Sequence, residues 1–134
     1  MRFAVLTAAL VLCCDFCLAA EPAVKLVEVQ KIWDEAPHNA FTDLIRWHDQ
    51  FVCVLREGHG HVSSDGRIRV LTSKDGKEWK SAAVVTLGDL DLRDAGLSIA
   101  PDGRLMLIGG VAPRKADGAT SSTGTFVSFS DDAE

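Results

Sequence analysis

The sequence predicts an all-β protein built from antiparallel hairpins, and three observations support that prediction. From residue 24 onward, short apolar runs with alternating or β-branched residues recur along the chain. Asp-Gly pairs, which favour the positive backbone angles of tight turns, separate several of them at Asp65-Gly66, Asp75-Gly76 and Asp102-Gly103. After residue 20, no stretch combines a helical apolar period with capping residues.

The first element that the sequence predicts is an export signal rather than part of the fold. A single positive charge at Arg2 precedes an apolar run over 3–14, and small residues lead up to Ala20. This pattern predicts a signal peptide at 1–20, cleaved after Ala20, and a secreted or periplasmic remainder at 21–134. A lipoprotein anchor is the alternative. The apolar run is too short for a permanent membrane span.

Six runs are then expected to form strands. In chain order they are 24–32, 51–55, 67–73, 82–87, 104–110 and 125–130. The run "FVCVL" at 51–55 is continuously apolar, as a strand buried on both faces would be. It contains Cys53, the one cysteine outside the signal peptide. Cys53 is therefore expected to be a small buried side chain, and a nucleophilic thiol is the alternative.

Two parts of the chain also repeat. The hairpins at 44–58 and 97–110 share one pattern, in which Phe51 corresponds to Leu105, 54 positions further along. The polar stretch after 67–73 recurs near the C-terminus, and there Ser73 corresponds to Ser130, 57 positions further along. Four-stranded repeats of about 40–50 residues are typical of propeller blades. We therefore expect an incomplete β-propeller of about two four-stranded antiparallel blades, with a chance likeness of two hairpins as the alternative.

The stretch "TSKDGKEW" carries the most specific motif, Ser73-x-Asp75-Gly76-x-x-Trp79. Serine and aspartate side chains bond nearby backbone, glycine takes the turn conformation, and the tryptophan covers the turn. The motif resembles the Asp-box, or BNR repeat, of sialidases and related propellers, where it is structural and lies at the outer rim. An ordinary Asp-Gly hairpin beside a tryptophan is the alternative.

The second copy of this motif departs from the pattern. Ser130 and Asp132 are present, but Ala133 stands where glycine is expected, and the sequence stops before an aromatic. Propellers have typically four to eight blades. The resemblance thus implies the N-terminal blades of a probable six-bladed ring, with the C-terminal blades missing.

The resemblance also implies where a substrate would bind. Sialidases hold the substrate carboxylate with arginines, and use an aspartate acid/base and a tyrosine nucleophile paired with a glutamate. Arg56 is similar to the arginine that follows the matching strand in sialidases and borders their site. Asp94 resembles their site aspartate, which makes it the catalytic candidate, and Arg93 beside it is a substrate-binding candidate.

The loop after Arg56 supplies the remaining substrate-binding candidates, which are Glu57, His59 and His61. Two histidines around a glycine could make a sugar contact or do acid–base work, and the alternatives are a plain polar loop loosened by the glycine, on the channel face, and a metal site. With no third ligand in register, we expect no metal, and no sequence motif calls for a cofactor.

Two departures weigh against catalysis by this chain alone. Thr42 stands where the Phe-Arg-Ile-Pro signature of sialidases has its arginine, and the sequence contains no tyrosine. The net charge of −5 and pI near 5.3 argue against a general affinity for nucleic acid or anionic lipid, but leave room for a local arginine pocket. The sequence thus predicts a secreted sialidase-like glycoside hydrolase acting on glycans, inactive as this piece. The alternative is a non-catalytic propeller that binds carbohydrate or protein.

Overall fold

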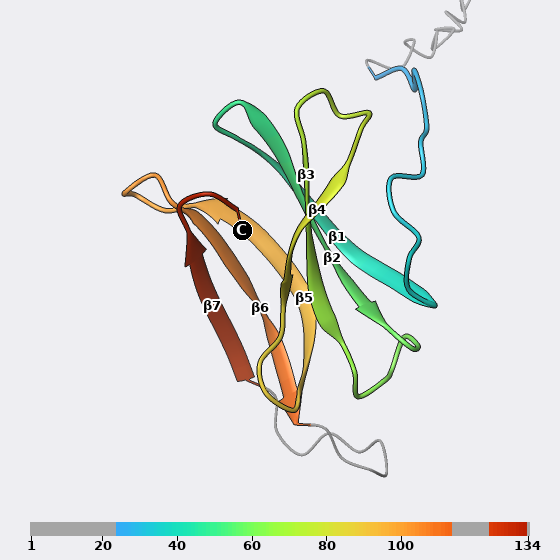
Figure 1. Cartoon of the computed structure of the whole chain (residues 1–134), viewed down its shortest axis with the longest axis vertical. Helices are drawn as coiled ribbons and strands as arrows, with labels where there is room; N and C mark the ends of the chain where they lie inside the picture. The colour runs from blue at the N-terminus through green and yellow to red at the C-terminus, as the bar shows by residue number, and fades with distance from the viewer. Residues whose placement is uncertain (1–23, 114–123, 134) are drawn as a thin grey trace, which may run out of the picture.

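The computed structural model describes residues 24–113 and 124–133, and every element in them is a β-strand. Figure 1 shows two sheets that splay apart from a shared core. The strands are β1 (His38–Trp47), β2 (Gln50–Gly58), β3 (Arg67–Ser73), β4 (Lys80–Val85), β5 (Leu90–Ile99), β6 (Leu105–Pro113) and β7 (Gly124–Ser130). The prediction of an all-β chain is confirmed.

Each strand within a sheet pairs antiparallel with the next one along the chain. The first sheet has the order β1-β2-β3-β4, which we call sheet A, and the second has the order β5-β6-β7, which we call sheet B. Sheet B has three strands in the described residues, where four were expected. Gly76 and Gly103 take positive φ angles of 74° and 88° in two of the turns, as their Asp-Gly pairs predict. The same prediction for Gly66 is wrong, because this residue lies in a longer loop, 59–66, and does not have a positive φ.

The repeat that the sequence predicts is present in the strand register. Phe51 pairs with Ser73 in sheet A, and the corresponding residue Leu105 pairs with Ser130 in sheet B. The first strand of each sheet also carries a register shift at the same repeat position, before Asp43 in β1 and before Gly96 in β5. The two sheets are therefore structural copies of one unit.

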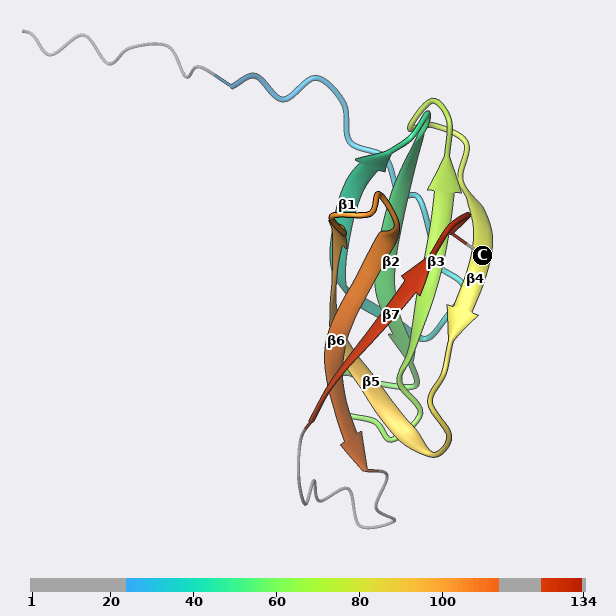
Figure 2. The ribbon, with the colours of Figure 1, turned by 90° about the vertical axis from the view of Figure 1, so that its left-hand side faces the viewer.

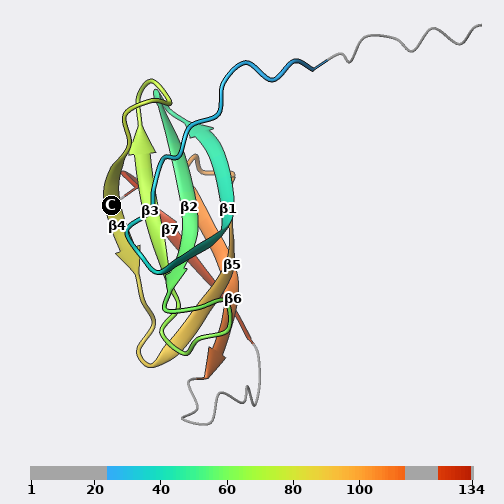
Figure 3. The same ribbon diagram turned by 90° about the vertical axis from the view of Figure 1, so that its right-hand side faces the viewer.

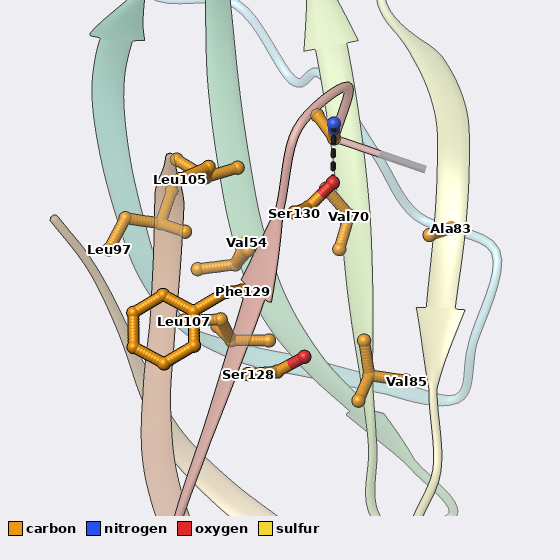
Figure 4. A pocket seen from close by; sticks show the side chains of 11 residues that line it. Val54, Val70, Ala83, Val85, Leu97, Leu105, Leu107, Ser128, Phe129 and Ser130 are labelled. Atoms are coloured by element: carbon orange, nitrogen blue, oxygen red, sulfur yellow. Dashed lines mark hydrogen bonds between the residues drawn. The ribbon is translucent and has the colours of Figure 1, made fainter. Parts of the chain in front are cut away.

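The main core lies between the two sheets, which face each other in Figure 2. Val54 and Val70 of sheet A meet Leu105 and Leu107 of sheet B in one buried cluster. Figure 4 shows these side chains around a small gap of about 70 Å³. Ligand pockets measure roughly 300–1,000 Å³, so this gap belongs to the core. Burial of β2 on both faces is confirmed, since Val52 to Leu55 are at most 3% exposed.

The prediction of a strand at 24–32 is wrong. Residues 24–37 form no strand, and Figure 3 shows them crossing the face of sheet A that points away from sheet B. Ile32 and Trp33 pack there on Cys53, Leu55 and Leu71. The earlier part of the segment pairs with no sheet edge. Its large apolar side chains therefore remain exposed, although their alternation is typical of a strand.

The turn between β3 and β4 has the hydrogen bonds that its residues predict. Ser73 Oγ accepts from the Gly76 amide at 2.9 Å, and Asp75 Oδ1 accepts from the amides of Lys77 and Glu78 at 2.9 and 3.0 Å. The Trp79 ring is half-buried against the cluster around Cys53, and its Nε1 donates to the Gly76 carbonyl at 3.0 Å. The aromatic ring thus pins the turn against the sheet.

The second turn of this kind shares the same geometry. Ser130 Oγ accepts from the Ala133 amide at 2.8 Å and donates to Asp132 Oδ1 at 3.0 Å. Ala133 has a φ of 69°, close to the 74° of Gly76, although an alanine is sterically strained there. The turn therefore forms even without glycine, and it buries the Ala133 methyl group in the core between the sheets.

Candidate functional site

The residues that the sequence singles out as a site gather at one end of the molecule. The 59–66 loop, the 86–89 link and the starts of β1 and β5 lie together in Figure 1. The hairpin turns with Ser73 and Ser130 lie at the other end. This separation follows from the meander topology, because alternate connections along the chain fall at opposite sheet ends. We call the end that carries the 59–66 loop the loop end.

Arg56 lies at the loop end but is fully buried, with 0% exposure. Its Nη2 is 3.0 Å from Asp91 Oδ1 and makes an ion pair there between β2 and β5. The guanidinium also donates to the carbonyls of Gly60 and Ser63, at 3.0 and 3.2 Å. Arg56 is therefore satisfied within the protein, and its prediction as a direct substrate contact does not fit this geometry.

Two glycines make room for this arginine. A side chain at Gly66 would collide with Asp91 Oδ1 and approach Arg56 Nε to 2.6 Å. A side chain at Gly58 would come within 2.9 Å of Arg56 Nη1. Gly66 is thus required for space around the ion pair rather than for a turn, which explains its ordinary φ. The Gly66 carbonyl also accepts from the Leu92 amide at 2.9 Å, which ties the loop to β5.

Asp91 joins Arg56 to Arg93. Its second oxygen, Oδ2, accepts from Nε and Nη2 of Arg93, both at 2.6 Å. Asp91 is buried, whereas 27% of the Arg93 side chain is exposed at the edge of this triad. Two guanidinium groups around one carboxylate leave a net positive charge, and Arg93 presents that charge at the surface.

Glu57 points to the other side of the sheet. Neighbouring residues in a strand alternate faces, so Arg56 faces sheet B and Glu57 faces the 24–37 segment. Glu57 accepts hydrogen bonds from Trp33 Nε1 at 2.7 Å, Arg67 Nε at 2.9 Å and Arg69 Nε at 3.0 Å. It is fully buried, so it holds the segment to sheet A and does not share a pocket with Arg56.

The environment of Glu57 also sets its charge. Burial by itself raises the pKa of this carboxyl, but hydrogen bonds from Arg69, Trp33 and Arg67 outweigh burial. The net effect holds the pKa of Glu57 below its ordinary value of 4.5. The buried carboxylate is therefore ionised and paired at neutral pH.

The histidines of the loop have different surroundings. His59 is exposed, and its amide donates to both oxygens of Asp65 at 3.1 and 3.0 Å. His61 is exposed as well, and its ring lies 5.5 Å from that of His38 and 5.4 Å from that of Phe41, between centroids. Hence His61, His38 and Phe41 form an aromatic cluster where the loop meets the start of β1.

The two first strands each contain a residue with an unusual backbone. Phe41 in β1 has a φ of 56°, and Asp94 in β5 has a φ of 49°. They occupy the same position of the repeat, within the two register shifts. Both side chains are exposed. The predicted site residue Asp94 and the unpredicted Phe41 are therefore structural counterparts.

Asp43 brings these two strands together. Its Oδ2 accepts from the Leu97 amide of β5 at 2.7 Å, and its Oδ1 accepts from the Leu44 amide at 2.9 Å. Gly96, next to Leu97, lies close to the same carboxylate, since a side chain there would be 3.7 Å from Oδ2. The bulge of β1 therefore lies beside the bulge of β5.

Four residues at this end were not predicted from the sequence as site residues: His38, Phe41, Asp43 and Asp91. His38 is the first residue of β1, and its ring packs edge-on to that of His61. The repeat indicates the equivalence of Phe41 and Asp94. When the Asp43–Val54 pair is superposed on the Gly96–Ile108 pair, Phe41 falls at the position of Asp94. The sequence holds no motif that points to Asp91, whose role follows only from its ion pair with the buried Arg56.

The described residues form a shallow surface at the loop end rather than a deep pocket. A hollow of about 140 Å³ lies beside His59, between the loop and residues 35–37. No group of three or more histidine, cysteine or acidic side chains suited to a metal ion occurs in the described parts of the chain. The groups exposed at the loop end include the Phe41 and His61 rings and the Asp94 carboxylate, and the Arg93 guanidinium is partly exposed there.

Comparisons with protein families, with curated proteins and with solved structures find no match to this chain. Within 24–113 and 124–133, no helix is long and apolar enough to cross a membrane. The predicted signal peptide at 1–20 lies outside the described residues. The function proposed for this chain therefore depends on the motif, the repeat and the geometry of the loop end.

Proposed function

We propose that this chain forms two neighbouring blades of a sialidase-like β-propeller whose loop end binds glycans. The observation that supports this proposal best is the repeated unit, with its serine-aspartate turns at one end and its two bulged first strands at the other. In this arrangement the structural motif and the exposed polar and aromatic groups occupy opposite ends. The resemblance implies the same separation between a structural motif and the groups that bind a substrate.

The outer face of sheet B supports the existence of further blades. Ile108 pairs with Val127 at the position where Val54 pairs with Val70 in sheet A. Val54 and Val70 are buried beneath sheet B, whereas Ile108 and Val127 are 42% and 53% exposed. Exposed apolar pairs on a sheet face are typical of a surface that another element covers. A further sheet of the same kind would bury them as sheet B buries their counterparts.

Glycan binding suits the geometry of the loop end better than catalysis does. Arg56 is occupied by Asp91, Glu57 faces the opposite side of the sheet, and Thr42 replaces the signature arginine. Arg93 supplies a partly exposed positive charge for an acidic sugar, and its ion pair with Asp91 holds the guanidinium in place. A single exposed arginine can bind a carboxylate through two parallel hydrogen bonds.

Hydrolysis remains the second candidate because of Asp94. This carboxylate is exposed beside Arg93 on the strained bulge of β5, and strained residues cluster at functional sites. In a complete ring, it would act as the acid or base, with the nucleophile supplied by another blade. The chain contains no tyrosine, so by itself it is not expected to complete that chemistry.

Binding and hydrolysis can be separated with one pair of measurements. Isothermal titration of the chain with sialyllactose tests binding, and release of a fluorophore from a fluorogenic sialoside tests turnover. We expect saturable binding that Arg93→Ala weakens, and no turnover. Absence of binding to sialyllactose and to neutral lactose would contradict the proposed function. Turnover abolished by Asp94→Ala would instead favour the hydrolase.

A further inference from the structure

We propose that Phe41, together with His61, forms a stacking surface for the apolar face of a pyranose ring at the loop end. This inference deepens the proposed glycan-binding function and rests on it. It assigns a ligand contact to the residue directly before Thr42, in the stretch compared with the sialidase signature.

The backbone of Phe41 is the first observation behind this proposal. A φ of 56° is a genuine outlier for a bulky residue, and such strain persists where the surrounding structure imposes it. The bulge itself does not need an aromatic, because glycine takes the same backbone conformation without strain. This position is nevertheless a phenylalanine, and the equivalent position in β5 is Asp94. The backbone conformation by itself therefore does not account for an aromatic ring at this position.

The exposure of the ring is the second observation. Phe41 is 43% exposed although it lies in a strand, at the register shift of β1. Its ring contacts that of His61 at 5.4 Å, and His61 in turn contacts His38 at 5.5 Å. Two exposed rings side by side form a surface that water solvates poorly.

The third observation is that this surface is held in place from both sides. Arg56 donates to the carbonyls of Gly60 and Ser63, which flank His61 in the loop. Asp43, two residues after Phe41, is bonded to the Leu97 amide of β5. A preorganised surface loses little conformational entropy when a ligand binds, so it can hold a sugar that offers only a few contacts.

The chemistry of the ligand follows from the groups around the rings. One face of a pyranose such as galactose carries several C–H groups, which pack on the negative face of an aromatic ring. Its hydroxyl groups can donate to a carboxylate, and Asp94 supplies one on the neighbouring bulge of β5. A charged substituent of the glycan would meet Arg93. The pair of bulges therefore suits a neutral pyranose linked to an acidic sugar.

The experiment replaces the strained phenylalanine with glycine. Phe41→Gly removes the ring and relieves the backbone, so the urea midpoint of unfolding should stay at or above that of the wild type. Its affinity for sialyllactose should fall about tenfold, which corresponds to about 1.4 kcal/mol. Saturation-transfer NMR on the wild type should show the strongest transfer to the C–H groups of a neutral pyranose.

The matched control is His48→Gly. His48 also has a positive φ, of 50°, but lies in the turn between β1 and β2 at the opposite end. This variant should gain stability and keep full affinity. Unchanged affinity in Phe41→Gly would overturn this inference while leaving the proposed function standing. A lower midpoint together with lost binding would assign the ring to folding and also overturn it. If the wild type binds neither sialyllactose nor lactose, the proposed function itself fails.

Discussion

At the scale of single residues, a buried arginine determines the shape of the loop end. The sequence motif points to Arg56 as a residue that reaches a ligand, but Asp91 and the loop carbonyls already satisfy it. Arg56 therefore fixes the position of the loop that carries His61. The buried ion pair also joins the two sheets, because Arg56 is in β2 and Asp91 is in β5.

Asp91→Asn tests the importance of this pair. The substitution removes the negative charge and leaves a buried guanidinium without a counter-ion, which should lower the free energy of unfolding by about 3–5 kcal/mol. Asp102→Asn is the matched control, because Asp102 pairs with Arg104 at 2.9 Å on the surface, where both side chains are exposed. Exposed pairs contribute about 0–1 kcal/mol. Equal effects of the two substitutions in urea denaturation would contradict the assigned role of Asp91.

Cys53 provides a second prediction at this scale. Burial raises the pKa of its thiol to about 11, and the nearby Asp43 carboxylate adds to the effect. The thiolate is the reactive form, so the native protein should react very slowly with a thiol reagent at neutral pH. The rate should rise to that of a free thiol in denaturing urea. Fast reaction of the folded chain would contradict the buried, structural role of Cys53.

The residue scale also separates local contacts, which the sequence predicts, from distant ones, which it does not. Composition and motif identified Ser73, Asp75 and Trp79 correctly as parts of a turn, because their hydrogen bonds are local in sequence. The partner of Arg56 lies 35 positions away, and strand alternation puts Glu57 on the opposite face from its neighbour. Such facts depend on how the sheets pack. For the same reason, the sequence could not show that Phe41 is strained or that it meets His61.

At the scale of elements, a loop before β3 and a turn after it define the two ends of this strand in sheet A. The turn after β3 is held by the buried Ser73, whose hydroxyl bonds both the Gly76 amide and Asp75. The loop between β2 and β3 is shaped by Arg56 and accommodated by Gly66. Each connection depends on one small residue at a crowded position, Ser73 in the turn and Gly66 in the loop.

Ser73→Ala should lower the free energy of unfolding by about 1–3 kcal/mol, because it leaves buried turn groups without a partner. Ser130→Ala is the comparison at the equivalent position of sheet B, where the serine–aspartate bond is exposed. Its effect should be smaller. Thermal unfolding of the two variants followed by circular dichroism measures this difference, and a larger loss for Ser130→Ala would contradict it.

Gly66→Ala tests the crowding around the ion pair. The added methyl group would displace Asp91 or Arg56, and overpacking of this kind costs about 1–3 kcal/mol. Gly60→Ala serves as the control from the same loop, because no atom lies within 4 Å of the position that its side chain would take. Urea denaturation should show a loss of stability for the first variant only.

At the scale of the whole molecule, three layers stack on one another: the 24–37 segment, sheet A and sheet B. Glu57 is the central contact between the first two, through Trp33 on the segment and Arg67 and Arg69 on β3. The outer face of sheet B has no such cover in the described residues, although it repeats the apolar pairs that sheet B covers on sheet A. Sheet A is therefore covered on both faces, by the segment on one side and by sheet B on the other, whereas the outer face of sheet B is open in the described residues.

The attachment of the segment should depend on pH. The pKa of Glu57 is lowered in the folded state, so its stabilising contribution is present above 4.5 and is lost as the pH falls through the lowered value. The unfolding free energy of the wild type should therefore decline in acid, and Glu57→Gln should reduce that slope. Glu78→Gln, which makes the same change of charge at an exposed position, is the control. An identical slope in Glu57→Gln and the wild type would contradict the assigned role.

The most direct test of the central claim is to map the glycan-binding surface by NMR. The amide signals of the isotope-labelled chain would be followed during titration with sialyllactose. If the loop end binds the glycan, the changes will cluster in residues 38–43, 59–63 and 91–96. Changes that cluster instead around Ser73 and Ser130 at the opposite end, or no changes at all, would contradict it.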